Sequence, residues 1–361
     1  MKPYCKHKQV SARLMVDLGA IRHNHASLAA FASGAECAAV VKADAYGLGM
    51  KQISAALVGK VNTFFVAHPE EGITLRKLYP DKTIFVLHGF LPGYAEVMSY
   101  YNLYPVLNSV SQVHNWQSFC HDKGYNYPAA IQFDTGMSRF GISESELHNE
   151  YVQRLKPVLV MSHLACADQP NHPANAAQRA CFLRMSAAFP GVPRSLSASA
   201  GILLGKEYHF EMVRPGVSLY GLTEQQTHMS LRPAVGLEAQ ILQIREIPAG
   251  AAIGYGLTYC AERPTRVATV GIGYADGVFR SFAQKGFLWK GNVPLPVIGR
   301  ISMDSLSVDI TVLSPDSVLE GDWLTLIGPE QDLARMAEQA GTISYEILTS
   351  LGYRFDRFYQ D

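Results

Sequence analysis

Basic and hydroxyl side chains directly follow several short apolar runs in this sequence. A lysine that ends an apolar run is partly desolvated, which lowers its pKa and favours Schiff-base chemistry. Glycine-containing turns and hydroxyl groups allow phosphate oxygens to approach closely. The residues are Lys42 in AVVKADAYGLG, Arg139 in FDTGMSRFG, His163 in SHLACAD, Ser199 in SASAG, and Arg214 with Gly216 in VRPGVSLYG. As a set they suit an anionic, phosphate-bearing ligand.

The elements that must position these residues alternate between apolar runs and helix-like stretches from about residue 36 to residue 221. Such alternation predicts an α/β fold with a parallel sheet, and eight units predict a closed, TIM-like (β/α)8 barrel. Active-site residues of a barrel lie at the C-terminal ends of its strands. Taken singly, each of these residues would more often be solvated or structural, so their shared position favours a functional site. The apolar runs are 37–41, 63–67, 83–87, 104–107, 129–133, 158–161, 195–197 and 212–213.

The pattern changes after about Leu231, where short strand-like segments are separated by glycine and proline turns. VGLEAQILQIREIPAG, TRVATVGIGYADG and LPVIGRISMDSLSVDI are examples. This texture predicts a second, mainly β domain. We therefore expect a barrel domain over residues 11–231 and a C-terminal β domain over residues 232–361, and leave open whether the first ten residues pack with the latter.

Composition limits the classes of partner. Lys plus Arg (31) equal Asp plus Glu (31), which favours neither nucleic acid nor an anionic membrane surface. The six cysteines show no close pairing typical of zinc sites or disulfide scaffolds, so we expect reduced thiols. No apolar segment follows the basic N-terminus as in a secretory signal, and we expect a cytoplasmic protein.

The AVVKADAYGLG segment is similar to the pyridoxal 5'-phosphate (PLP) attachment segment of alanine racemases. The likeness continues in the same order along nearly the whole chain, through FDTGMSRFG, SHLACAD, VRPGVSLYG, GYADG, ISMD and YRFDRFY. One such block is weak, but a collinear series is specific. The resemblance implies a fold-type III PLP enzyme, an amino-acid isomerase that works as a head-to-tail homodimer with shared active sites.

The resemblance also implies roles for individual residues. Lys42 would hold PLP as an aldimine and serve as one catalytic base, and Tyr274 of the partner subunit would be the other. Arg214 would face the pyridine nitrogen, Arg139 would approach the substrate carboxylate, and His163 would lie beside the catalytic tyrosine. The phosphate would be bound by Tyr46, Ser199, Gly216, Val217 and Tyr353, and the partner subunit would add Met303 against the substrate, with Asp304 as a supporting residue.

Two bases are needed because a racemase must remove the Cα proton from one face and return a proton to the other. The ordinary phenol pKa is about 10, so we expect His163 and neighbouring positive charge to help Tyr274 act as a base. Arginine stays charged and only donates hydrogen bonds. Arg214 would therefore leave the ring nitrogen unprotonated and limit side reactions. Tyr274 and Met303 would favour a small substrate, with alanine first and serine second.

Some residues depart from the common family pattern. Gln132 stands where many members carry a carbamylated lysine that orients the arginine corresponding to Arg139. We expect no carbamate here, with the glutamine amide or a bound anion in its place. Asp44 and Leu48 replace a usual Asn and a frequent His, and Ala198 replaces a usual Asn before Ser199.

Other functions remain open from the residues. A racemase for another small amino acid, such as serine, would share every motif. A PLP-dependent decarboxylase would carry an acidic residue in place of Arg214 and a cysteine in place of Tyr274. A metal-dependent barrel hydrolase would use histidines such as His23 and His25, but these lie in a helix-like stretch where i and i+2 point apart, and we expect no metal. A PLP carrier module would leave the C-terminal domain unexplained. The sequence does not separate peptidoglycan synthesis, which needs D-alanine, from alanine breakdown.

Overall fold

The computed structural model describes residues 10–223 and 229–361, which form two compact units. The first, called here the barrel unit, spans Ala20–Arg232. The second, called the β unit, joins residues 10–19 to Pro233–Asp361. Among the described residues, no helix is long and apolar enough to cross a membrane.

The barrel unit contains the eight strand segments expected from the apolar runs, the first of them split in two at Ala38. β3 to β9 form one parallel sheet in chain order. β10 closes the ring: it pairs with β2 in parallel, and the Arg214 N–H donates to the Ser197 carbonyl at 2.9 Å beyond β9. The predicted barrel is confirmed. Its strands are β2 Glu36–Cys37, β3 Ala39–Val40, β4 Thr63–Val66, β5 Thr83–Val86, β6 Tyr104–Leu107, β7 Ala130–Gln132, β8 Leu159–Met161, β9 Arg194–Ser195 and β10 Met212–Val213.

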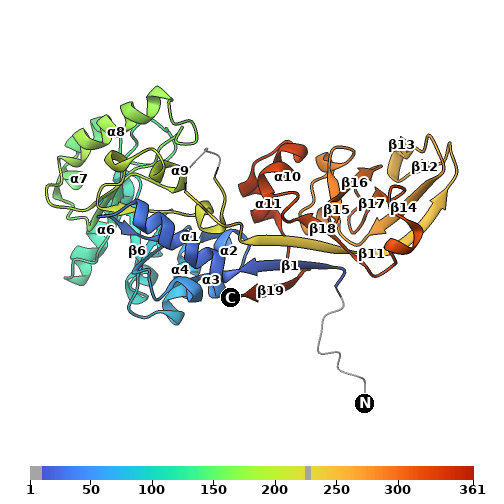
Figure 1. The fold of residues 1–361 in the computed structure, drawn as a ribbon. Coiled ribbons are helices and arrows are strands. Elements are labelled where there is room, and N and C mark those ends of the chain that lie inside the picture. The colour runs from blue at the N-terminus through green and yellow to red at the C-terminus, as the bar shows by residue number, and fades with distance from the viewer. Residues whose placement is uncertain (1–9, 224–228) are drawn as a thin grey trace, which may run out of the picture. The chain divides into compact units, whose positions relative to one another are not determined.

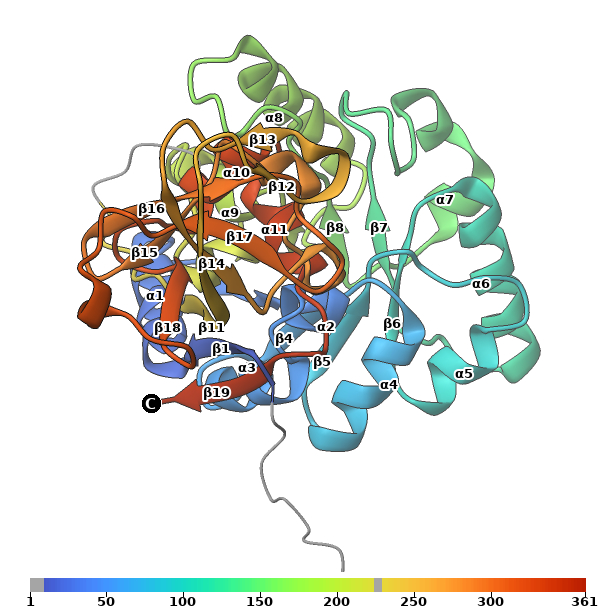
Figure 2. The same ribbon diagram turned by 90° about the vertical axis from the view of Figure 1, so that its right-hand side faces the viewer.

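Helices cover the outside of this sheet, as the turned view shows for α4, α5 and α6 beside β4 to β7 (Figure 2). A strand buried on both faces reads as a continuous apolar run, and every residue of β4, TFFV, is buried. Local signals set the helix ends: the Ser109 side chain caps α6, and Gly124 ends it with φ +64°. The helices are α1 Leu18–Phe31, α2 Lys42–Tyr46, α3 Met50–Leu57, α4 Pro69–Leu78, α5 Ala95–Tyr100, α6 Val110–Lys123, α7 Glu150–Arg154, α8 Pro173–Ser186 and α9 Ser199–Ile202.

The β unit is built on an eight-stranded sheet in the order β14-β17-β16-β15-β18-β11-β1-β19, with a further β14–β11 pairing. Its pairings are antiparallel except for β1 with β19. Two helices, α10 Leu333–Ala340 and α11 Ser344–Ser350, follow β18. The strands are β1 Ala12–Asp17, β11 Val235–Ile247, β14 Thr265–Val270, β15 Phe287–Lys290, β16 Val293–Ile298, β17 Leu306–Asp309, β18 Trp323–Ile327 and β19 Asp356–Gln360, with a separate hairpin of β12 Ala252–Ile253 and β13 Tyr259–Cys260.

The strand β1 belongs to a different unit from the one that the sequence predicts for it. Residues 11–19 were assigned to the barrel domain, but β1 lies between β11 and β19 in the β unit (Figure 1). Leu14 is paired with Leu237 on one side and with Arg357 on the other. The local alternation of ARLMVD predicts a strand, but it cannot show that the partner strands lie more than two hundred residues later.

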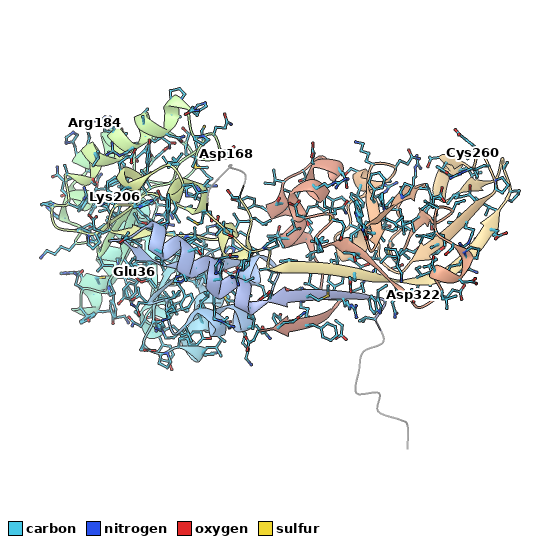
Figure 3. All side chains as sticks on the ribbon, viewed as in Figure 1. Glu36, Asp168, Arg184, Lys206, Cys260 and Asp322 are labelled. Carbon is cyan, nitrogen blue, oxygen red and sulfur yellow. The ribbon has the colours of Figure 1, made fainter. Side chains whose placement is uncertain are left out.

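The cysteines of the described residues are all free thiols, and Cys260 is exposed on β13 (Figure 3). Cys37 is buried beside Glu36, and burial followed by the Glu36 charge raises the pKa of its thiol to about 12. That thiol is therefore protonated and unreactive near neutral pH. Cys5 lies outside the described residues.

Candidate active site

Lys42 lies two residues after the last residue of β3, beyond the C-terminal end of the first barrel strand. Burial, then the charges of Arg139 and Arg214, lowers the pKa of its amine, and the Glu71 carboxylate acts in the opposite direction. These electrostatic interactions show that three of the predicted residues, from β3, β7 and β10, meet at one mouth. A lysine with a lowered pKa is more often an unprotonated nucleophile near neutral pH.

The chain leaves Lys42 in a left-handed turn. Ala43, Asp44, Ala45 and Tyr46 all have φ between 53° and 57°. A left-handed conformation costs a non-glycine residue roughly 1–2 kcal/mol, so four in succession persist only where the surroundings hold them. Within the turn, the Asp44 carboxylate accepts the Met50 N–H at 2.7 Å. This substitution for the usual Asn thus keeps an oxygen that ties the turn to α3.

Arg139 lies on a loop that is organised by Asp134. The Asp134 carboxylate accepts the N–H groups of residues 136, 137 and 138 at 2.9–3.0 Å. Burial raises the pKa of Asp134, but these donors outweigh it and the net pKa is lowered, so the carboxylate stays ionised. Gly141 must be glycine, because its φ is +118° and an added Cβ would lie 2.4 Å from the Asp134 nitrogen. The sequence analysis named Arg139 but missed Asp134, although an Asp two residues before a Gly can bond the backbone of a turn through its side chain.

Gln132 is buried at the end of β7 and supports the same loop. Its amide nitrogen donates to the Phe140 carbonyl at 3.4 Å. The neutral amide therefore supports the backbone next to Arg139. A pocket of about 510 Å³ lies beside this loop, lined by Asn108, Ser109, Gln112, Asp134, Ser138, Arg139, Phe140 and Gly141.

Arg214 is held inside the barrel, with only 3% of its surface exposed. Its guanidinium donates to the Ser195 hydroxyl at 2.5 Å and to the Ser162 carbonyl at 2.7 Å. Burial lowers its pKa to about 9, so it still carries its charge near neutral pH. The hydrogen bonds to β8 and β9 fix the guanidinium plane at the barrel mouth.

His163 lies among the cations of this mouth, where the sequence analysis expects it to help Tyr274 together with neighbouring positive charge. Burial, and then the charges of Arg214, Arg139 and Lys42, lowers its pKa to about 3. The imidazole is therefore neutral near neutral pH, because burial disfavours its charged form and three neighbouring cations would repel a fourth. The positive charge at this mouth comes from the arginines.

The predicted phosphate-binding residues meet at the ends of β9 and β10. The Ser199 hydroxyl accepts the N–H groups of Gly216 and Ser218 at 3.0 and 3.1 Å. An added Cβ at Gly216 would lie 2.2 Å from the Tyr46 hydroxyl, and Val217 between them is buried. Backbone amides and two hydroxyls thus converge around a glycine with no side chain, which is the donor set that a phosphate requires. Ala198, before Ser199, offers no side-chain hydrogen bond here.

The other predicted residues belong to the β unit. Tyr274 and Met303 are 42% and 52% exposed, so both are available to a ligand or to another chain. The Tyr274 N–H donates to the Ser302 carbonyl, and the Ala275 N–H donates to the Met303 carbonyl, both at 3.0 Å. GYADG and ISMD are therefore one structural feature. Tyr353 is 74% exposed, with the Arg357 guanidinium 5.3 Å from its ring centre.

Arg354 links this feature together and was not identified from the sequence. Its guanidinium donates to both Asp276 oxygens at 2.7 and 2.9 Å, and to Asp304 at 2.6 Å. The buried Asp276 also accepts the Gly273 N–H at 2.9 Å. One arginine thus holds the two turns on either side of Tyr274 and Met303. We refer to Asp276, Asp304 and Arg354 as the Arg354 clamp.

The histidines considered for a metal are bonded to backbone carbonyls instead. A His25 ring nitrogen lies 3.0 Å from the Cys37 carbonyl, and one of His23 lies 3.0 Å from the Ser230 carbonyl. Within residues 10–223 and 229–361, no group of three or more His, Cys, Asp or Glu is arranged to hold a metal ion.

Family models fit almost the whole chain. The model of the alanine racemase N-terminal domain matches residues 16–224, and that of the C-terminal domain matches residues 234–359. The chain belongs to the alanine racemase family. The resemblance inferred from the collinear motifs is therefore confirmed.

Individual alanine racemases are similar to this chain over nearly their full length. The chain is 43% identical to the "Alanine racemase, catabolic" of Agrobacterium fabrum, covering 97% of this chain and 92% of the relative. It superposes with a TM-score of 0.93 on the Bartonella henselae alanine racemase, solved with covalently bound pyridoxal phosphate, at 40% identity and with 97% and 99% of the two chains covered. The biosynthetic alanine racemase of Pseudomonas aeruginosa gives a TM-score of 0.89 at 33% identity, with 98% and 100% covered.

Proposed function

We propose that this protein is a PLP-dependent alanine racemase that interconverts L-alanine and D-alanine. Membership in the family supports the activity. The observation that carries the proposal is the barrel mouth itself, where Lys42 with its lowered pKa faces Arg139 and Arg214. The phosphate-type donor set around Gly216 lies at the ends of β9 and β10 in the same ring of strands.

The residues present fit PLP. Lys42 would bond to its aldehyde carbon, the Ser199 and Tyr46 hydroxyls beside Gly216 would hold its phosphate, and Arg214 would meet its ring nitrogen. When bound, PLP supplies an electron-withdrawing ring that makes the substrate Cα proton acidic. Arginine keeps its charge and only donates hydrogen bonds. A ring nitrogen facing Arg214 would therefore accept a hydrogen bond and stay unprotonated.

Proton transfer at Cα would use Lys42 on one face and Tyr274, from a partner subunit, on the other. The lowered pKa of Lys42 raises the fraction of its Nζ that is unprotonated and able to accept a proton. Because His163 is neutral, the charges of Arg139 and Arg214 are the groups that would favour the tyrosinate. This proposal needs a homodimer, in which the exposed Tyr274 and Met303 of one chain complete the site of the other.

Arg214 distinguishes a racemase from the decarboxylase alternative. An acidic residue at the ring nitrogen would protonate it and strengthen the electron sink, whereas the hydrogen bonds from Arg214 to Ser195 and Ser162 hold a cation there. With Arg214 at its ring nitrogen, the cofactor would withdraw electrons less strongly, which would favour simple return of the proton over side reactions. Alanine rather than serine, a cytoplasmic location, and a role in supplying D-alanine for peptidoglycan or in alanine breakdown stay predictions from the sequence.

The test is a chiral assay of the purified protein with PLP and L-alanine, repeated with L-serine. Enantiomers have equal free energy in water, so a racemase drives either one to an equal mixture. We expect an equal mixture from alanine, loss of activity in Lys42→Ala by a factor of at least about 10³, and full activity in the exposed control Lys60→Ala. Release of carbon dioxide would indicate a decarboxylase, and racemisation of serine alone would correct the substrate.

A further inference from the structure

The carboxylate of Glu71 joins the turn after Lys42 to the end of the neighbouring strand. One oxygen accepts the Ala43 N–H at 2.7 Å. The other accepts the Ala67 N–H at 2.8 Å and the His68 N–H at 3.3 Å, directly after β4. Glu71 lies in the first turn of α4. One side chain thus binds backbone groups of the segments that follow two adjacent barrel strands, β3 and β4.

This arrangement exceeds ordinary helix capping. A capping glutamate at the third helical position reaches back to the backbone at the start of its own helix, and the bonds to Ala67 and His68 do this. The bond to Ala43 leaves the helix and reaches the first left-handed residue of the turn. Strained backbone of this kind is stable only where neighbours hold it. The Glu71 bond supplies such support immediately next to Lys42.

The same carboxylate acts on Lys42 through its charge. Burial and the two arginines lower the pKa of Lys42, while Glu71 raises it. The charged and titratable groups that face Lys42 from the surrounding elements are Glu71, His88, Arg139, His163 and Arg214. Glu71 is the anionic member of this set, so its removal leaves only groups that disfavour a protonated Lys42.

We propose that Glu71 is the positioning residue of Lys42: its carboxylate holds the left-handed turn against the end of β4 and places a negative charge beside the lysine. This inference rests on the proposed role of Lys42 as the residue that bonds PLP. Glu71 itself needs no contact with substrate or cofactor. It acts by fixing where Lys42 leaves the sheet and by setting the pH range in which its Nζ reacts.

The experiment follows the reaction of the full-length protein with PLP by visible absorbance across a pH series, which gives the rate of bond formation and the dissociation constant. Glu71→Gln keeps the size but loses the charge and turns an NH2 group toward one of the N–H donors. We expect the midpoint of the rate–pH profile to move to lower pH, because losing an anion lowers the pKa of Lys42 further. We expect the PLP dissociation constant to rise about tenfold with the loss of a charge-assisted hydrogen bond.

Glu71→Asp separates the two effects. It keeps the charge but is one methylene too short to reach both backbone sites, so we expect weaker PLP binding with a midpoint close to that of the parent. If Glu71→Gln does not fold, Glu71→Asp decides, and an unchanged dissociation constant would overturn the proposal.

The matched control is Glu146→Gln. Glu146 makes the same capping contact with the Ser143 N–H, at 2.8 Å, in a short helix without a bond to the turn after Lys42. If the variants of both glutamates behave alike, Glu71 is only a capping residue and the proposal is wrong. Lys42→Ala tests the premise separately: if the parent forms no adduct that this variant lacks, the proposed function fails, whatever Glu71 does.

Discussion

Arg214 and His163 share one cationic, buried mouth and respond to it differently. Burial lowers the pKa of Arg214 to about 9, which still leaves its side chain charged near neutral pH. The same burial and three neighbouring cations lower the pKa of His163 to about 3, which leaves the imidazole neutral. The outcome follows from the starting pKa values of 12.5 and 6.5, and it makes arginine the lasting source of positive charge at the site.

The neutral state of His163 has a consequence for stability. In the unfolded chain the imidazole gains its proton near pH 6.5, whereas in the folded chain it does so only near pH 3. Below pH 6.5 the unfolded state therefore binds more protons, and the free energy of unfolding falls as the pH falls toward 3. In His163→Gln this contribution is absent, so we expect a shallower decline.

Urea unfolding of the full chain without PLP, at several pH values between about 4 and 6.5, measures this difference, because the window lies between the two pKa values. Carboxylate titration is common to parent and variant and cancels in the comparison. Replacing the exposed His121 with Gln is the control and should follow the parent. Parallel curves for the parent and His163→Gln would show that His163 is not held neutral.

At the scale of elements, the strand ends were predictable and the turns were not. β9 and β10 are only two residues long, yet the polar residues after them identified their place, because every barrel strand ends at the same mouth. The left-handed turn after Lys42 contains no glycine at residues 43–46, so local propensity predicts the wrong conformation. Glu71 was missed for a related reason: its contact with Ala43 depends on a neighbouring strand that local sequence does not specify.

The Arg354 clamp joins two separate turns, the one that carries Tyr274 and the one that carries Met303. In Arg354→Gln the buried Asp276 loses two charge-assisted hydrogen bonds, which costs about 1–2 kcal/mol given the half-exposed guanidinium. We expect the unfolding midpoint to drop and kcat to fall by about tenfold or more, because a misplaced base loses transition-state contact. Arg354→Lys should be intermediate, since an ammonium cannot bond in the bidentate manner.

Steady-state kinetics and thermal unfolding test this expectation. The control is Arg245→Gln, which removes an arginine whose guanidinium donates to the exposed Gln243 side chain. An Arg354→Gln variant with unchanged kcat would mean that the turns are held without the clamp.

At the scale of the whole molecule, the chain carries Lys42 and Tyr274 on different compact units, and the proposed mechanism takes them from different subunits.

Hybrid dimers test whether the two residues of one site come from different subunits. Lys42→Ala and Tyr274→Phe chains with different affinity tags are co-expressed, and the doubly tagged hybrid is isolated. If each active site takes Lys42 from one chain and Tyr274 from the other, one site of the hybrid contains both substitutions and the other site contains neither. The hybrid should then show about half the activity of the parent dimer, since a twofold assembly has two equivalent sites. The separate Lys42→Ala and Tyr274→Phe homodimers should be nearly inactive. If each site were built from a single chain, both sites of the hybrid would lack a base, and an inactive hybrid would rule out shared active sites.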